Sequence, residues 1–180
     1  MKIIFHILID FLMLICLVIG HIALSLFCPY PLSKISIYFA GLILWLLWNP
    51  RGRIVWYTFF ACFVIELYSV MPFGLNLFSG TAAMLFAFWL YRHIFTNRSW
   101  YACFVLSIVV LGIYRSLYSI GLLFLNLFGK YVEISWQSLF FTSFWEMMLT
   151  TLMVGFLYFI ISLFSNKLNP RVIEARYFRI

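Results

Sequence analysis

Residues 66–76 read Glu-Leu-Tyr-Ser-Val-Met-Pro-Phe-Gly-Leu-Asn and join two long apolar segments. Pro72 cannot continue a helix without losing a backbone hydrogen bond, and Gly74 adopts without strain the positive φ that a chain reversal requires. We therefore predict a short hairpin turn comprising Ser69, Pro72 and Gly74. Because the connection is short, the two flanking helices are predicted to be antiparallel neighbours.

Glu66 lies inside the first of these segments, about one and a half helical turns before Pro72. A charged side chain at the centre of a membrane-spanning helix costs about 2.5–3.5 kcal/mol on an insertion scale. A carboxylate in this position therefore requires a partner, and the hairpin places it near the shared end of both helices.

The composition indicates a membrane protein. Of the 180 residues, 66% are hydrophobic and only 9% are charged, whereas about 25% of the residues of a soluble domain are charged. Apolar segments of about 20 residues recur along the whole chain and leave no room for a water-soluble domain. The formal net charge of +7 does not indicate nucleic-acid binding, because the basic residues lie between apolar segments rather than on one face.

We predict an all-α polytopic membrane protein with six transmembrane helices at residues 3–28, 35–49, 54–71, 75–95, 100–128 and 137–164. These helices form a single bundle over residues 1–165. A basic cytoplasmic tail over residues 166–180 follows, and its expected partner is the lipid headgroup region of the bilayer. The second span is short and the fifth is long, so we expect the fifth to tilt or to project from the membrane.

Basic residues between the spans predict the orientation, because cytoplasmic loops carry an excess of lysine and arginine. With the N-terminus inside, the outer side holds only Lys34 and Lys130. The cytoplasmic side then holds Lys2, Arg51, Arg53, Arg92, Arg98, Lys167, Arg171, Arg176 and Arg179. We therefore predict that both termini are cytoplasmic and that the number of spans is even.

Three ionisable residues within the spans form a predicted intramembrane polar cluster: Glu66, Arg115 and Glu146. At about 1.5 Å per residue, all three fall near the middle or in the outer half of the bilayer. Each belongs to a polar stripe at helical spacing, so the three stripes can converge on one interior site. We predict that Arg115 neutralises Glu66, Glu146 or both. We favour a packing role for this cluster over transport or catalysis, although intramembrane charges also mark ion and substrate paths.

A secondary polar face in the first span carries His6, Asp10 and His21. His6 and Asp10 are spaced for a hydrogen-bonded pair, but His21 is about 16 Å further along the helix axis than Asp10. Because a metal ion needs its ligands at one depth, no metal site is predicted. The sequence shows no nucleophile with a neighbouring base, nucleotide-binding loop or cysteine–histidine cluster, so we predict no catalytic site, no cofactor and no enzyme.

The fourth span carries Ser79, Ala83 and Ala87 at consecutive four-residue steps. Small residues at this spacing form a ridge that lets another helix backbone approach closely. Because the neighbouring helix belongs to the same chain, we expect the ridge to pack within the molecule rather than against a second copy.

The motif Glu-Leu-x-Ser-x-x-Pro-x-Gly over residues 66–74, with the span that follows it through Leu90 and Tyr91, resembles the signature region of the bacterial rod shape-determining protein MreD family. The usual pattern of that family is an acid, Leu, x, Ser, Gly, x, Pro, Leu, Gly. Here Val70 and Phe73 replace the first Gly and the second Leu, and the acid is Glu rather than the commoner Asp. The specific resemblance covers about thirty residues. Chain length, six spans and internal termini extend the general resemblance to nearly the whole chain.

This resemblance implies a non-enzymatic scaffold in the cell-elongation machinery of the bacterial inner membrane. Members of the family are tied to the bitopic membrane protein MreC, and through it to the actin-like MreB and to peptidoglycan synthases. Their fold is thought to be similar to the substrate-binding subunits of energy-coupling-factor vitamin transporters, which suggests an alternative function in binding a small molecule. We favour the scaffold, because the predicted outer loops 29–34, 72–74 and 129–136 are short and hold few polar side chains.

Overall fold

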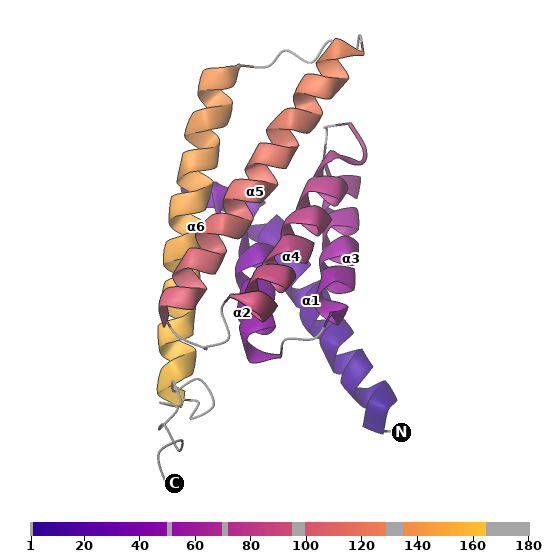
Figure 1. The fold of residues 1–180 in the computed structure, drawn as a ribbon, viewed down its shortest axis with the longest axis vertical. Coiled ribbons are helices and arrows are strands. Elements are labelled where there is room, and N and C mark those ends of the chain that lie inside the picture. The colour runs from indigo at the N-terminus through magenta and orange to yellow at the C-terminus, as the bar shows by residue number, and fades with distance from the viewer. Residues whose placement is uncertain (1, 50–51, 70–71, 95–99, 129–134, 165–180) are drawn as a thin grey trace, which may run out of the picture.

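The computed structural model of the protein describes residues 2–49, 52–69, 72–94, 100–128 and 135–164, with the side chains of residues 8–163 within these ranges. This part of the chain is helical apart from its connections (Figure 1). Its elements are α1 (Lys2–Phe27), the short 3₁₀ helix η1 (Leu32–Lys34), α2 (Ile37–Trp48), α3 (Arg53–Leu67), α4 (Leu75–His93), α5 (Trp100–Leu127) and α6 (Trp136–Phe164).

Each of the six predicted spans corresponds to one α-helix, and the largest difference is at the end of α3. This helix was predicted to reach residue 71, but it ends at Leu67. The N–H group of Tyr68 donates to the carbonyl of Ile65 at 3.1 Å, and that of Ser69 donates to the carbonyl of Glu66 at 3.0 Å. Bonds over three residues tighten the last turn and end the helix. The predicted tail over residues 166–180 lies outside the described residues.

Three helical segments are long and apolar enough to span a membrane: Leu8–Phe27, Trp100–Leu127 and Trp136–Leu163. They indicate a membrane protein. The remaining helices are shorter, with 12 residues in α2, 15 in α3 and 19 in α4. At about 1.5 Å per residue, these three helices are about 18, 22 and 28 Å long, less than the roughly 30 Å of a hydrocarbon core.

The shortest α-helix, α2, lies at the centre of the bundle and packs against α1, α3, α5 and α6. Its side chains Phe39, Leu42, Ile43 and Leu46 are completely buried. A helix that is apolar on every side has no face to present to water and is expected in the interior. The residues Ile-Tyr-Phe-Ala-Gly-Leu-Ile-Leu-Trp-Leu-Leu-Trp of α2 meet that description.

The small-residue ridge of α4 packs inside the molecule, as predicted. Ser79, Ala83 and Ala87 have no exposed surface. Beside them, Gly80 lies so close to Cys62 of α3 that a Cβ atom on Gly80 would collide with the Cys62 sulfur. The ridge therefore allows α3 and α4 to approach each other closely.

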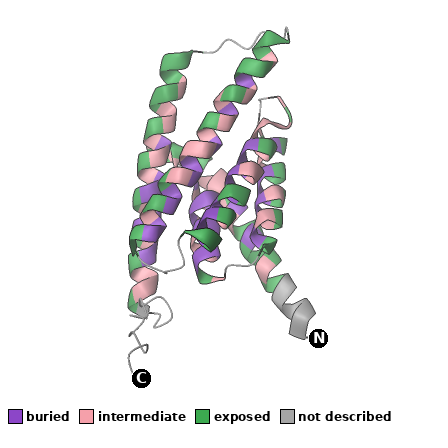
Figure 2. Ribbon diagram, viewed as in Figure 1, coloured by how far each residue is buried: buried purple, intermediate pink, exposed green. Residues whose placement is uncertain are grey.

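Helices α5 and α6 form a hairpin that extends beyond the other helices at one end of the molecule (Figure 1). They have 28 and 29 residues and are each about 42 Å long. Their projecting ends are largely exposed (Figure 2) and carry the large apolar side chains Phe124, Leu127, Phe128, Trp136, Phe140 and Phe141. The start of α1 and the end of α6 both lie at the opposite end of the molecule, on different sides of it.

Candidate functional site

The carboxylate of Glu66 closes the α3–α4 hairpin. Glu66 is only 3% exposed. Its Oε1 atom accepts hydrogen bonds from the backbone N–H groups of Gly74 at 2.7 Å and Asn76 at 3.2 Å, and Oε2 accepts one from Leu77 at 3.2 Å. These donors lie at the start of α4, where N–H groups have no partner within the helix. The carboxylate satisfies all three and lies at the positive end of the helix dipole.

Gly74 makes this contact possible through its backbone conformation. It immediately precedes α4 and has a φ of +105°, the only positive φ among the described residues. A Cβ atom on Gly74 would meet nothing within 4 Å, so a larger side chain is disfavoured by backbone strain rather than by lack of space. The predicted turn residues Ser69 and Pro72 lie in the same connection, and both are half-buried.

We expect Gly74→Ala to lower the free energy of unfolding by about 1–2 kcal/mol, because a Cβ atom disfavours the left-handed region by this amount. Gly112→Ala is the matched control. A Cβ atom on Gly112 would also meet nothing within 4 Å, but Gly112 lies inside α5 and its φ is not positive. There, alanine is expected to be neutral or to stabilise by up to about 1 kcal/mol. Thermal unfolding in detergent micelles measures both changes, and equal melting temperatures would contradict a backbone requirement at Gly74.

A second carboxylate, that of Glu146, joins three helices. Glu146 lies on α6 and is 3% exposed. Its Oε2 atom forms an ion pair with Nη2 of Arg115 on α5, and its Oε1 atom accepts a hydrogen bond from the hydroxyl of Ser36. Ser36 immediately precedes α2, and its N–H group donates to Oγ1 of Thr150 at 3.1 Å, one helical turn beyond Glu146. These contacts fix the start of α2 to α6, and α6 to α5.

Two tyrosines of α5 complete the surroundings of Arg115. The guanidinium carbon lies 5.5 Å from the ring centroid of Tyr114 and 5.7 Å from that of Tyr118, both within the range of a cation–π interaction. The hydroxyl of Tyr114 donates to Oδ1 of Asn76 at 2.9 Å, while the N–H group of Asn76 donates to Glu66. Tyr114 therefore connects the surroundings of Arg115 to those of Glu66.

Together these contacts form a polar belt across the bundle, composed of Ser36, Glu66, Asn76, Tyr114, Arg115 and Glu146. The belt lies where α2 begins, α3 ends and α4 begins, so all three short helices have an end at this level. In α5 and α6 it lies in the middle of the helix. Helix α5 continues for about 18 Å beyond Arg115. The projecting α5–α6 hairpin is therefore the part of the molecule that lies beyond the belt.

The three residues of the predicted polar cluster belong to this belt, but they have different partners. Arg115 forms its ion pair with Glu146. Among the described residues, no ion pair joins Arg115 to Glu66, whose carboxylate is instead satisfied by backbone N–H groups. The alternative in which Arg115 neutralises both acids is therefore not the observed arrangement.

Ser36, Asn76 and Tyr114 are members of the belt that were not predicted from the sequence. A signal existed for Ser36, because a serine just before an apolar helical segment is typical of a helix start. No comparable signal existed for the donors to Glu66, because every residue except proline carries a backbone N–H group. Tyr114 is one of 11 tyrosines, and residue type alone does not distinguish it from the others.

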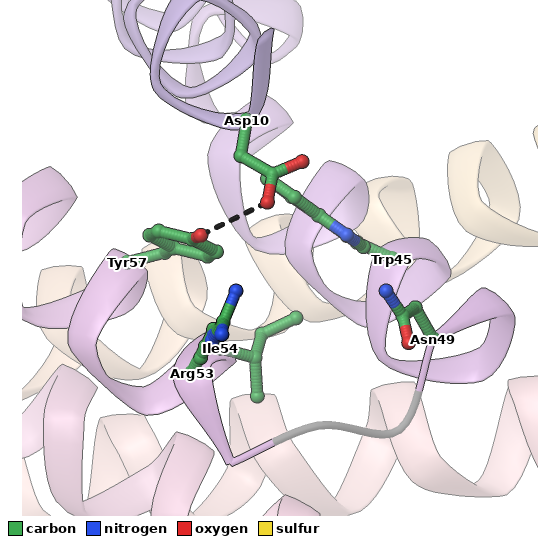
Figure 3. A pocket seen from close by; sticks show the side chains of 6 residues that line it. All are labelled: Asp10, Trp45, Asn49, Arg53, Ile54 and Tyr57. Atoms are coloured by element: carbon green, nitrogen blue, oxygen red, sulfur yellow. Dashed lines mark hydrogen bonds between the residues drawn. The ribbon is translucent and has the colours of Figure 1, made fainter. Parts of the chain in front are cut away.

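The predicted secondary polar face of α1 does not form one site. Oδ2 of Asp10 accepts a hydrogen bond from the Tyr57 hydroxyl of α3 at 3.0 Å (Figure 3). This contact borders a cavity of about 10 Å³, enough for roughly one water molecule, that is lined by Asp10, Trp45, Asn49, Arg53, Ile54 and Tyr57. His21 instead lies against the ring of Tyr38, with ring centroids 4.9 Å apart. The side chain of His6, and with it the predicted His6–Asp10 pair, lies outside the described residues.

In the part of the chain that the structure describes, no three His, Cys, Asp or Glu side chains lie close enough together to hold a metal ion. The candidate site is the polar belt, which holds two buried carboxylates. Their partners are backbone N–H groups for Glu66, and a guanidinium and a hydroxyl for Glu146. The interpretation of the belt rests on this geometry, because no family model, no curated protein and no solved structure matches the chain.

Proposed function

We propose that this protein is an integral-membrane scaffold of the bacterial cell-elongation (rod shape) machinery. In this role it holds an MreC-like bitopic membrane protein and, through it, peptidoglycan synthases. The observation that carries the proposal is the bonding of the polar belt. Its two carboxylates hold the ends of α2 and α4 in place, which favours a structural role for these intramembrane charges over a role in moving ions or substrates.

The bonding of Glu66 also supplies a physical reason for the motif that resembles the MreD signature. The acid and the final glycine of the motif act as a unit, because the N–H group of Gly74 donates to the Glu66 carboxylate at 2.7 Å. Gly74 supplies the positive φ that brings the chain back, and Pro72, which cannot belong to the interior of a helix, lies in the connection after α3 ends at Leu67. The acid, the proline and the glycine of the motif are thus the positions on which this hairpin depends, which supports the resemblance.

The proposal includes six passages through the bacterial inner membrane, with both termini in the cytoplasm. A bilayer adapts to short hydrophobic helices by thinning around them at modest cost, which makes α3 and α4 acceptable as spans. Helix α2 is surrounded mainly by other helices, so its short length causes little mismatch with the lipid. An even number of spans requires both chain ends on one side, and the start of α1 and the end of α6 lie at the same end of the molecule. The proposal also includes a fold similar to the substrate-binding subunits of energy-coupling-factor transporters.

We place the partner in a groove between α5 and α6, beside the polar belt. The groove has a volume of about 420 Å³ and is lined by Arg115, Ser116, Ser119, Trp136, Leu139, Phe140, Ser143, Phe144 and Met147. Its serines allow a helix backbone to approach closely, and its aromatic rings offer a large apolar contact area. A single transmembrane helix is the kind of partner that such a groove between two helices accepts.

Co-purification with a co-expressed single-span partner tests this function. Ser143→Trp fills the groove and is expected to reduce recovery of the partner at least tenfold, equivalent to about 1.4 kcal/mol. Leu152→Trp is the control, because Leu152 is exposed on the same helix and does not line the groove. Equal recovery by both variants would contradict the proposed surface. Rod-shaped cells after depletion of the protein would contradict the scaffold function itself.

The size and polarity of the same groove favour a second candidate, the binding of a vitamin-type small molecule. A volume of about 420 Å³ lies within the range of about 300–1,000 Å³ that is typical of ligand sites, and Arg115 with the three serines offers polar contacts. Thermal stabilisation by a panel of vitamins distinguishes this candidate. A clear rise in melting temperature that Ser143→Trp abolishes would favour it over the scaffold.

A further inference from the structure

A second apolar groove runs along the outer surface of α4, away from the polar belt. It has a volume of about 530 Å³ and is lined by Ala82, Leu85, Phe86, Phe88, Trp89, Arg92 and His93. These residues recur at steps of three and four and therefore share one face of the helix. The small side chain of Ala82 leaves the groove open at one end. From there to His93 the groove is about 16 Å long.

Three neighbouring aromatic rings form one wall of this groove. The ring centroids of Phe86 and Trp89 are 5.6 Å apart, and those of Trp89 and His93 are 5.1 Å apart with an interplanar angle of 29°. Nδ1 of His93 lies 2.9 Å from the carbonyl oxygen of Trp89. Because a carbonyl oxygen only accepts, Nδ1 carries the hydrogen and donates it, which fixes the imidazole ring against the indole.

The groove ends at a positive charge that has no acidic partner among the described residues. Arg92 is exposed in the last turn of α4. The three described acidic side chains, Asp10, Glu66 and Glu146, have their contacts with Tyr57, the start of α4 and Arg115. An apolar channel of this length with a cation at one end matches a molecule that has a hydrocarbon chain and an anionic head.

We propose that the α4 groove binds an anionic phospholipid, with an acyl chain along Ala82, Phe86 and Trp89 and the phosphate at Arg92. Trp89 is 49% exposed and lies three residues before Arg92 on α4, and indole rings favour the membrane–water interface. The guanidinium of Arg92 presents paired N–H donors to phosphate oxygens. This inference is independent of the proposed scaffold function. In the proposed orientation the Arg92 end of α4 faces the cytoplasm, so the lipid lies in the cytoplasmic leaflet, and only this placement depends on the orientation.

Native mass spectrometry of the delipidated full-length protein tests the proposal. The probes are phosphatidylglycerol and phosphatidylcholine with identical acyl chains, and glycerol phosphate as a headgroup without chains. A basic residue near an anionic lipid surface contributes enough for about a fivefold preference, so we expect phosphatidylglycerol to be retained about fivefold more than phosphatidylcholine. Glycerol phosphate is not expected to be retained.

Three variants locate the binding. Arg92→Gln should abolish the preference for phosphatidylglycerol, and Ala82→Leu should reduce retention of both phospholipids by filling the groove. Arg53→Gln is the matched control, because Arg53 is exposed at the start of α3 and does not line this groove. Equal retention of both phospholipids by the parent protein, or an equal loss of preference in Arg92→Gln and Arg53→Gln, would overturn the proposal. Unchanged retention in Ala82→Leu, or Arg92-dependent retention of glycerol phosphate, would also overturn it.

Discussion

Arg115→Leu is expected to lower the free energy of unfolding by about 3–5 kcal/mol, the range observed when one member of a buried ion pair is removed. The substitution leaves the carboxylate of Glu146, which is 3% exposed, without its cation and with only the hydroxyl of Ser36 as a partner. It also removes the cation–π contacts with Tyr114 and Tyr118. The shift in the denaturation midpoint of the protein in detergent micelles measures this loss.

A double variant distinguishes the cost of an unpaired charge from the loss of packing. Arg115→Leu combined with Glu146→Leu removes both charges together, so most of the lost stability should return. Arg53→Leu serves as the control for arginine removal, because Arg53 is exposed and lies outside the α4 groove, and little change is expected there. If Arg115→Leu unfolds at the same midpoint as the parent protein, the ion pair does not hold α5 to α6.

Glu66→Ala is the second substitution with a large expected effect, a loss of about 3 kcal/mol or more. It leaves the N–H groups of Gly74, Asn76 and Leu77 without their acceptor. Each unsatisfied buried donor costs about 1–3 kcal/mol, and the start of α4 loses a favourable negative charge. Thermal unfolding measures the loss, and hydrogen exchange at the first turn of α4 shows whether it is located there.

Glu66→Gln is the matched control for charge and should have an intermediate effect. Its carbonyl oxygen can replace Oε1 as the acceptor for two N–H groups, but its amide group points a donor at the N–H of Leu77. Glu66→Ala combined with Gly74→Ala should cost less than the sum of the single substitutions, because both act on one hairpin. Strict additivity, or a Glu66→Ala variant as stable as the parent, would contradict the capping role of Glu66.

The number and order of the helices were predictable from the sequence because both follow from local features. In each apolar segment the backbone N–H and C=O groups must bond to one another, which favours a helix. Each segment ends at residues that interrupt helices, such as Pro72 and Gly74. The end of α3 was less predictable. Residue 71 is still apolar, but the helix ends at Leu67, where the carboxylate of Glu66 turns to the first N–H groups of α4.

The sequence limited the predicted partners of Arg115 to Glu66, Glu146 or both, and did not distinguish between these possibilities. Depth along the helix axis allowed Arg115 to meet Glu66, Glu146 or both, since all three lie at comparable levels. Rotation of α5 about its axis and its packing against α6 decide between these possibilities, and neither can be deduced from a hydrophobic pattern that is apolar on most sides. The pairing of Asp10 with Tyr57 was missed for the same reason.

Local features of the chain are enough to predict the six α-helices of the described residues, the antiparallel pairing of α3 with α4 and the chemistry of the turn at Gly74. Backbone hydrogen bonding and φ preferences act within a few residues. Three features follow from the packing of the helices and not from the sequence: α2 is the central helix, Arg115 pairs with Glu146 rather than Glu66, and Glu66 caps α4. The packing of α2 and the Arg115–Glu146 ion pair join residues far apart in the chain, and each requires two helices to match in depth and rotation at once. The capping of α4 adds a further reason, because its donors are backbone N–H groups, which do not depend on residue type.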